Sequence, residues 1–204
     1  MGQRWIEDVN TAPDCELSGS LDIGGDIRAG LAGARVLIDF TRPEGTLAHM
    51  TVCRELGVAA VVGTTGFSPE QKAEVAAHAA RIPIMMAPNM SVGVNVVFKL
   101  LDVAARALNE GYDVEIVEAH HRHKVDAPSG TALKIAEVLA HAVNRDLEQV
   151  GVYARKGLIG ERKKGEIGIQ TIRAGDIVGD HTILFGGMGE RIEVTHRASS
   201  RDTF

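Results

Sequence analysis

Cysteine and aromatic side chains are scarce in this chain of 204 residues. Only two cysteines are present, Cys15 and Cys53, and they form no Cys-x-x-Cys pair, which excludes a disulfide scaffold and a zinc ribbon. Aromatic residues make up 4% of the chain, which argues against a base-stacking platform for nucleic acid. We therefore expect a protein of a reducing compartment, with the cytoplasm as the simplest location.

The chain also lacks an excess of positive charge and any long apolar run. Its 22 Lys and Arg against 27 Asp and Glu give a formal net charge of −5, whereas a general nucleic-acid binder needs a basic face. No apolar run approaches the ~18 residues of a membrane span, and no signal peptide is recognisable. We expect neither nucleic acid nor membrane as a partner. The 45% of hydrophobic residues can form a packed core, and the 23 glycines suggest many tight turns, often around a ligand.

Strand and helix signals alternate in the first half of the chain. Short apolar runs predict three strands, at residues 36–40, 58–62 and 82–87. Two capping boxes, Thr41–Glu44 and Ser68–Gln71, predict the helices between them, which end near Leu56 and Ala80. This β-α-β-α-β order predicts parallel strands in a doubly wound, Rossmann-like α/β sheet.

Three loops follow the predicted carboxyl ends of these strands, at the edge where open α/β sheets bind ligands. They are Thr41–Pro43, Gly63–Gly66 and Pro88–Met90. Ordinary strand-to-helix turns would explain each of them. Because Gly63–Gly66 places two hydroxyls between two glycines, a binding role and a structural role both stay open there.

The second half reads as an α+β domain that begins near residue 91. Apolar residues at helical spacing predict one helix over residues 91–110 and a second over 131–143. Four strands are predicted, at residues 113–119, 166–173, 181–185 and 191–197, and Gly-rich turns, including Arg173–Asp176, join the last three. Strands in succession predict a mixed or antiparallel sheet.

The predicted sheet carries more apolar side chains than one small helix can cover. One small helix, 131–143, is too little for both faces, and an uncovered apolar face usually marks an interface. We therefore predict a symmetric homotetramer. The apolar residues that carry this prediction are Ile167, Ile169, Ile172, Ile183, Ile192 and Val194.

Three of the eight histidines lie within the segment Glu118–Lys124. A metal site is disfavoured, because Arg122 and Lys124 would place two cations beside it. A solvated polar turn and an anion site with acid–base groups are the other two interpretations. The following Ser129-Gly130-Thr131 favours the anion site, since the free N–H groups at a helix start attract negative charge. A small carboxylate or phosphate would fit.

The segment Glu118–Ala132, EAHHRHKVDAPSGTA, resembles the signature of the 4-hydroxy-tetrahydrodipicolinate reductase family. The resemblance implies an NADH- or NADPH-dependent reductase of lysine and diaminopimelate biosynthesis, which forms a tetramer through its C-terminal sheets. Further segments resemble the same family: Ile38–Pro43, Gly63–Phe67, Asn89 with Ser91–Asn95, Arg173–Asp176 and Ala198–Arg201.

The resemblance also implies individual roles. His120 resembles the family's proton donor and acceptor, and Lys124 its proton donor. Asp22, after the run Glu16–Leu21, resembles the acidic residue that ends the second strand and binds the adenosine ribose. No metal is implied. The implied substrate-binding residues are His121, Ser129, Gly130 and Thr131. The other implied cofactor contacts are Gly63, Thr64, Thr65, Ala87, Pro88, Asn89 and Met90. On this assignment, Gly63→Val should weaken cofactor binding and leave the fold intact.

The chain departs from the family pattern near both ends. It opens at Met1-Gly2, where the family has a strand and a glycine turn, and it ends at Thr203-Phe204, before a further helix of the family. We therefore expect a cofactor domain over 1–90 without its first strand, a substrate and tetramerisation domain over 91–198, and a returning segment over 199–204. Two other functions stay open: a non-catalytic oligomeric binding module, and a related dehydrogenase acting on another small dicarboxylate.

Overall fold

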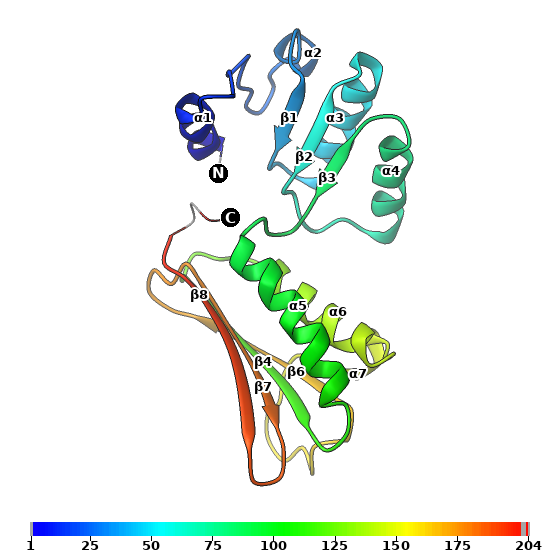
Figure 1. Ribbon diagram of the computed structural model, residues 1–204, viewed down its shortest axis with the longest axis vertical. Helices are drawn as coiled ribbons and strands as arrows, with labels where there is room; N and C mark the ends of the chain where they lie inside the picture. Colours follow the sequence, from blue (N-terminus) through cyan, green and yellow to red (C-terminus); the bar gives the residue numbers. More distant parts are fainter. Residues whose placement is uncertain (1, 201–202, 204) are drawn as a thin grey trace. The chain divides into compact units, whose positions relative to one another are not determined.

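The structure is a computed structural model, and it describes residues 2–200 and 203. The chain forms two compact units that divide between Pro88 and Asn89 (Figure 1). Asn89 and Met90, predicted among the cofactor contacts, therefore belong to the second unit. No helix among the described residues is long and apolar enough to cross a membrane.

The first unit is built on a parallel sheet with the order β1-β2-β3. Its strands are β1 (Val36–Asp39), β2 (Ala59–Val62) and β3 (Ile84–Met86). Two helices connect them, α3 (Pro43–Leu56) and α4 (Pro69–Ala79). The predicted β-α-β-α-β order and the Rossmann-like character of this unit are confirmed.

The two predicted capping boxes have different outcomes. At α4 the box is present: Ser68 Oγ accepts from Gln71 N at 3.2 Å, and Gln71 Oε1 accepts from Ser68 N at 2.9 Å. At α3 the prediction is wrong, because the N-cap is Arg42 and no side chain caps the helix. The hydroxyl of Thr41 instead donates to Asp39 Oδ1 at 2.7 Å.

The segment before β1 differs most from the sequence prediction. Helices α1 (Gly2–Thr11) and α2 (Ile27–Gly30) were not predicted. The strand predicted to end at Asp22 is absent, and Glu16–Asp22 is exposed and irregular. A strand forms only where a neighbour completes its hydrogen bonds, and this segment pairs with no strand of the described chain.

The second unit is built on a mixed sheet with the order β5-β6-β4-β7-β8. The central strand β4 pairs parallel with β6 and antiparallel with β7, and β7 pairs antiparallel with β8. The predicted α+β character is confirmed, while α7 and β5 were not predicted. The elements are α5 (Val92–Ala107), β4 (Asp113–His120), α6 (Gly130–Ala142), α7 (Leu147–Val150), β5 (Gly151–Val152), β6 (Ile167–Arg173), β7 (Gly179–Gly186) and β8 (Arg191–Ala198).

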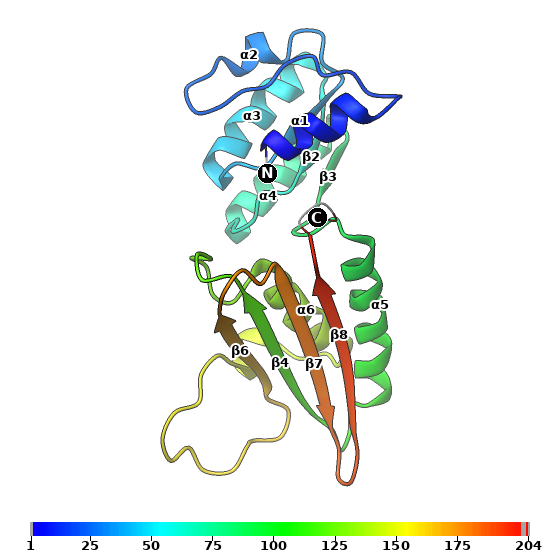
Figure 2. The ribbon, with the colours of Figure 1, turned by 90° about the vertical axis from the view of Figure 1, so that its left-hand side faces the viewer.

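Two helices, α5 and α6, cover one face of this sheet, and Figure 2 shows the other face toward the viewer. The core between the layers contains Leu101, Ile116, Leu139 and Phe185, each at most 1% exposed. The prediction counted one covering helix where two are present, and the other face still has no covering helix among the described residues (Figure 2). Three of the apolar residues that carried it are buried in the same core: Ile167, Ile169 and Ile183.

Ile172 alone among the apolar residues of that argument points to the uncovered face. Side chains alternate along a strand, so Ile172 lies opposite Ile169 and Ile167 on β6. Its side chain is 46% exposed. The same alternation places three apolar residues of neighbouring strands on this face, namely Val117, Ala119 and Leu184.

Candidate active site

In the first unit, the edge of the sheet is organised around the buried carboxylate of Asp39. Asp39 ends β1 and is 2% exposed. Its Oδ1 accepts from Thr41 Oγ1 at 2.7 Å, from Thr46 Oγ1 at 3.0 Å and from Thr64 Oγ1 at 3.2 Å. Its Oδ2 lies 2.6 Å from His49 Nδ1. Burial raises the pKa of Asp39, but hydrogen bonds from His49 and the threonines outweigh burial and lower it below its ordinary value.

This network joins two of the predicted ligand loops. Thr64 Oγ1 also accepts from the backbone N–H of Thr41 at 3.0 Å, so the loop after β2 is tied to the loop after β1. The hydroxyl of Thr64 is thus used inside the protein, and the residue is 5% exposed. Thr65 and Gly66 are exposed at the tip of the same loop, and Gly66 has φ 87°.

Gly63 has a packing role that the sequence did not reveal. A Cβ at this position would lie 1.9 Å from the ring of Phe40, which in turn stacks on Trp5 with ring centroids 5.4 Å apart. A larger residue would therefore displace Phe40. Gly63→Val would therefore change the packing of the first unit as well as the loop, and its effect on the fold stays a prediction.

The other predicted cofactor residues have varied surroundings. Ala87 donates its N–H to Val62 O at 3.1 Å, and Pro88 is exposed. In the second unit, Asn89 Oδ1 accepts from Ser91 N at 2.9 Å, and its Nδ2 donates to Thr131 Oγ1 at 3.3 Å. Asp22 is exposed and accepts from the next backbone N–H at 2.8 Å. Its predicted ribose contact stays a prediction, although the strand that motivated it is absent.

In the second unit, the site is built around His120, the last residue of β4. The residue is 8% exposed, and its Nδ1 lies 2.5 Å from Glu118 Oε2. Arg173 ends the neighbouring strand β6 and pairs in register with His120. The guanidinium of Arg173 donates to both carboxylate oxygens of Glu118, each at 2.9 Å.

Glu118 is fully buried and remains ionised. Burial favours the neutral acid, but the hydrogen bonds from His120 and Arg173 outweigh burial and lower the pKa of Glu118 to about 2. Its Oε1 also accepts from Ser129 N at 3.1 Å and from Thr171 Oγ1 at 3.2 Å. One carboxylate therefore contacts the histidine strand, the neighbouring strand and the start of α6.

The start of α6 lies directly beside this carboxylate. Ser129 caps the helix by accepting from Ala132 N at 3.2 Å, and its Oγ lies 3.2 Å from His181 Nε2. Gly130 and Thr131 form the first turn of the helix, where N–H groups are free for an anion. Burial and the nearby His120 lower the pKa of His181 to about 4, so its ring is neutral at pH 7.

The loop between β4 and α6 carries the remaining predicted residues. Lys124 Nζ lies 2.8 Å from Asp126 Oδ1, and the Lys124 side chain is 21% exposed. The rings of His121 and His123 lie 6.3 Å apart, and His123 is exposed. His120, Lys124 and the start of α6 thus lie along one connected segment, with proton-exchanging and anion-attracting groups together.

Sequence reasoning missed Glu118, Arg173, His181 and Asp39 as members of these networks. Glu118 could have been found, because residues two apart on a strand share a face, and Glu118 and His120 are such a pair. Arg173 was interpreted as part of a turn. Its pairing with Glu118 depends on the register of β4 with β6, which the sequence does not state.

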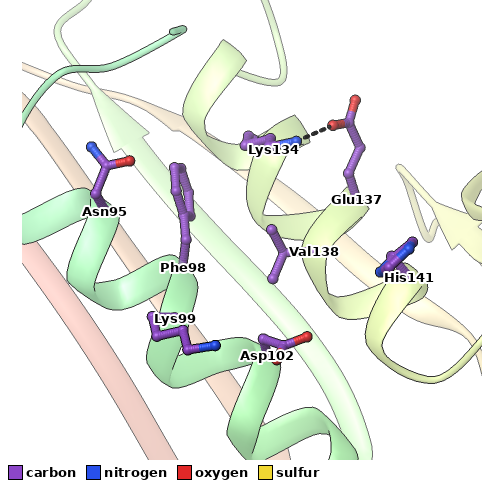
Figure 3. A pocket seen from close by; sticks show the side chains of 8 residues that line it. All are labelled: Asn95, Phe98, Lys99, Asp102, Lys134, Glu137, Val138 and His141. Atoms are coloured by element: carbon purple, nitrogen blue, oxygen red, sulfur yellow. Dashed lines mark hydrogen bonds and ion pairs between the residues drawn. The ribbon is translucent and has the colours of Figure 1, made fainter.

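The hollow between α5 and α6 is a separate feature (Figure 3). This open groove of about 590 Å³ is lined by mixed charges, including Lys99, Asp102, Lys134 and Glu137. None of the predicted site residues lines it. We therefore place the candidate site at the strand ends and at the start of α6.

Comparison with known proteins decides the family. The chain matches the family model of the dihydrodipicolinate reductase N-terminus over residues 1–90 and that of the C-terminus over residues 93–204. The chain belongs to the dihydrodipicolinate reductase family. All of the chain aligns at 55% identity with 84% of the 4-hydroxy-tetrahydrodipicolinate reductase of Nitrosomonas europaea. This alignment runs over 226 positions, so that relative has positions that the 204 residues lack.

Other members of the family are similarly close. The 4-hydroxy-tetrahydrodipicolinate reductase of Aromatoleum aromaticum is 63% identical over 91% of the chain and 68% of its own length. Among solved structures, the dipicolinate-bound dihydrodipicolinate reductase of Paenisporosarcina sp. TG-14 matches with a TM-score of 0.74 and 27% identity. That match covers 100% of this chain and 85% of the other. The fold of the chain therefore agrees with that of a solved member of the same family.

Proposed function

We propose that this chain reduces 4-hydroxy-tetrahydrodipicolinate to tetrahydrodipicolinate with NADH or NADPH, as a step of lysine and diaminopimelate biosynthesis. The observation that carries the proposal is the segment from His120 to Thr131, which joins a buried histidine, a lysine and a free helix start. Relatives named for this reaction at 55% and 63% identity support it. The non-catalytic module is not favoured, since both units match reductase models.

We assign the pyridine nucleotide to the first unit. The loops after β1 and β2 are held together by the Asp39 network, and Thr65 and Gly66 are exposed beside it, which fits a ligand that lies over the sheet edge. Once bound, the nucleotide supplies a hydride to carbon. The residues assigned to hold it are Asp22, Gly63, Thr64, Thr65, Ala87 and Pro88, together with Asn89 and Met90.

We assign the substrate carboxylates to the start of α6. The backbone N–H groups of Gly130 and Thr131 and the positive end of the helix attract a carboxylate, by roughly 0.3–2 kcal/mol for the dipole alone. Ser129 and His121 are assigned to the same role, since a hydroxyl and an imidazole donate hydrogen bonds. These groups bind the substrate before and during the reaction, so they act mainly on affinity.

We assign the proton transfers to His120 and Lys124. Loss of the 4-hydroxyl group as water requires a proton on the leaving oxygen, and hydride addition to the ring requires a proton on a neighbouring atom. An imidazole can both accept and donate a proton, which is the role assigned to His120, and the ammonium of Lys124 can donate one. The charge of Lys124 would also stabilise negative charge that develops on the substrate.

Steady-state kinetics of four alanine variants test these roles. Lys124→Ala and His120→Ala should each lower kcat by roughly 10²-fold or more, because each removes a proton-transfer group. His121→Ala should chiefly raise KM. His123→Ala is the matched control, because His123 is an exposed histidine of the same loop. Near-normal kcat in both Lys124→Ala and His120→Ala would refute the acid–base assignment.

Two further measurements separate the alternatives. Calorimetric titration with NADH and NADPH should show binding and reveal the preferred nucleotide, whereas no binding of either would favour the non-catalytic module. A panel of small cyclic dicarboxylates, followed through the absorbance of the reduced nucleotide, should give the highest kcat/KM with 4-hydroxy-tetrahydrodipicolinate. A higher value with another dicarboxylate would favour the related dehydrogenase.

A further inference from the structure

We infer that Glu118 is a positioning residue that keeps the proton of neutral His120 on Nδ1 and so leaves Nε2 as the nitrogen that exchanges protons. The inference rests on the proposed function only in its kinetic consequence. The tautomer itself is a property of the protein alone.

The first support is the chemistry of the contact between the two side chains. Glu118 is 0% exposed, and its Oε2 lies 2.5 Å from His120 Nδ1. The guanidinium of Arg173 keeps this carboxylate ionised. An ionised carboxylate can only accept hydrogen bonds, so the nitrogen that faces it must donate. In a neutral imidazole, the proton is therefore on Nδ1, and Nε2 carries the lone pair.

The second support is the space around Nε2. Gly179 on β7 faces His120, and a Cβ at Gly179 would lie 3.1 Å from Nε2. The absence of a side chain there leaves room for the imidazole edge that carries Nε2. The ring of His181 contacts the His120 ring edge-on, with centroids 5.2 Å apart, and limits its rotation. The ring is therefore held with Nδ1 toward Glu118.

The third support is that the two oxygens of Glu118 have separate partners. Oε2 contacts His120 Nδ1 and accepts from Arg173 Nη1. Oε1 accepts from Ser129 N, from Thr171 Oγ1 and from Arg173 Nη2. The side chain assigned to proton exchange and the N-cap residue of α6 are thus fixed by the same carboxylate. A substitution that changes one oxygen alone can separate the two effects.

Glu118→Gln is such a substitution. The amide oxygen can keep the place of Oε1, with its bonds from Ser129 N and Thr171, while the amide nitrogen replaces Oε2. The amide N–H then donates to His120 Nδ1 and drives the proton to Nε2. We expect kcat to fall about tenfold or more, with KM and the cofactor Kd changed by no more than about threefold.

Two other variants accompany it. Because the glutamine side chain would present an amide N–H to the guanidinium, the double variant Glu118→Gln with Arg173→Met removes that opposed donor and should show the same fall in kcat. Thr171→Val is the matched control, because it removes a hydrogen bond to Oε1 and leaves Oε2 with His120 untouched. Its kcat should stay within about twofold of the parent.

Long-range ¹H–¹⁵N correlation spectra of protein labelled at histidine report the tautomer directly. We expect Nδ1–H for His120 in the parent and in Thr171→Val, and Nε2–H in Glu118→Gln and in the double variant. Nε2–H in the parent would overturn the inference, as would unchanged kcat in both Glu118 variants. If the parent protein showed no reductase activity, the proposed function would fail, and the spectra would still decide the tautomer.

Discussion

Two buried carboxylates, Asp39 and Glu118, organise the two units at the level of single residues. Each lies near the carboxyl end of a strand and is at most 2% exposed. Such groups are tolerated in a protein interior only when partners compensate the lost hydration. Hydroxyls and an imidazole compensate Asp39, and a guanidinium and an imidazole compensate Glu118. Ion-pair and hydrogen-bond chemistry therefore fixes the loops on which the proposed site depends.

His181 makes the stability of the second unit depend on pH. Its pKa is about 4 in the folded protein and 6.5 as the ordinary value. The unfolded chain thus binds the proton more tightly than the folded protein does. The free energy of unfolding should therefore be highest above pH 6.5 and decrease as the pH drops toward 4. The expected loss from this group alone is about 3 kcal/mol.

Denaturant unfolding at several pH values checks this expectation. The near-ultraviolet signal of tyrosine reports the second unit, because Tyr112 and Tyr153 both lie there. In His181→Gln, the free energy of unfolding should change less between pH 6.5 and 4 than in the parent. In His123→Gln, which alters an exposed histidine, it should change as much as in the parent. An equal slope in His181→Gln and the parent would contradict the assignment.

Gly63 is expected to be sensitive to the smallest added side chain. A Cβ would overlap the ring of Phe40, so Gly63→Ala should destabilise the first unit by about 1–3 kcal/mol. The fluorescence of Trp5, the single tryptophan, reports the change because its ring stacks on Phe40. The double variant Gly63→Ala with Phe40→Leu should lose less free energy of unfolding than the two single variants lose in sum. Additive costs would show that the two residues do not compete for space.

At the level of elements, α3 and α4 begin with similar sequences and different caps. Arg42-Pro43-Glu44 and Ser68-Pro69-Glu70 both place Pro and Glu in the first turn, but only Ser68 caps its helix with its side chain. Ser68→Ala should therefore destabilise the first unit by about 1 kcal/mol. Arg42→Ala should change its stability by less than about 0.5 kcal/mol. Thermal unfolding followed by Trp5 fluorescence compares them, and equal effects would argue against the capping role.

The elements that the sequence predicted are those with local signals. Apolar runs and glycine or proline boundaries were enough for β1, β2, α4, α5 and β4, because these patterns follow from burial and backbone geometry. The cap of α3 was predicted wrongly, because Thr41 has a partner in Asp39 that competes with the helix N–H groups. The strand ending at Asp22 was predicted by resemblance, and no neighbouring strand is present among the described residues to pair with it.

The candidate site could likewise be predicted where its residues are close in sequence, and could not where they are far apart in the chain. His120, Lys124 and Ser129–Thr131 lie within one short segment, so their proximity could be expected from the sequence. Arg173 is far from Glu118 in the chain, and the two meet only because β4 pairs with β6. The register of that pairing depends on which face of each strand is buried, which the sequence alone left open.

At the level of the whole molecule, the homotetramer stays a prediction, and the uncovered face of the second sheet supports it (Figure 2). One end of that face is occupied by charge, because Arg155 and Arg162 both contact Glu115, at 2.7 Å and 3.1 Å. Ile172 lies beside Val117, Ala119 and Leu184 in the middle of the face. The edge formed by β7 and β8 is charged again, with the ion pairs Arg197–Asp180 and Arg191–Glu193. Such an apolar patch on an uncovered sheet is suited to pairing with a second copy.

Light scattering of the purified chain at micromolar concentration should give the mass of a tetramer, and Ile172→Glu should shift it toward smaller species. In a symmetric assembly each copy would bury the new carboxylate without a partner, which costs several kcal/mol per copy. Leu100→Glu is the control, because Leu100 is similarly exposed, at 53% against 46%, but lies on α5 in the helical layer. Dissociation by Leu100→Glu alone would place the interface on the helices, and a monomeric parent would refute the tetramer.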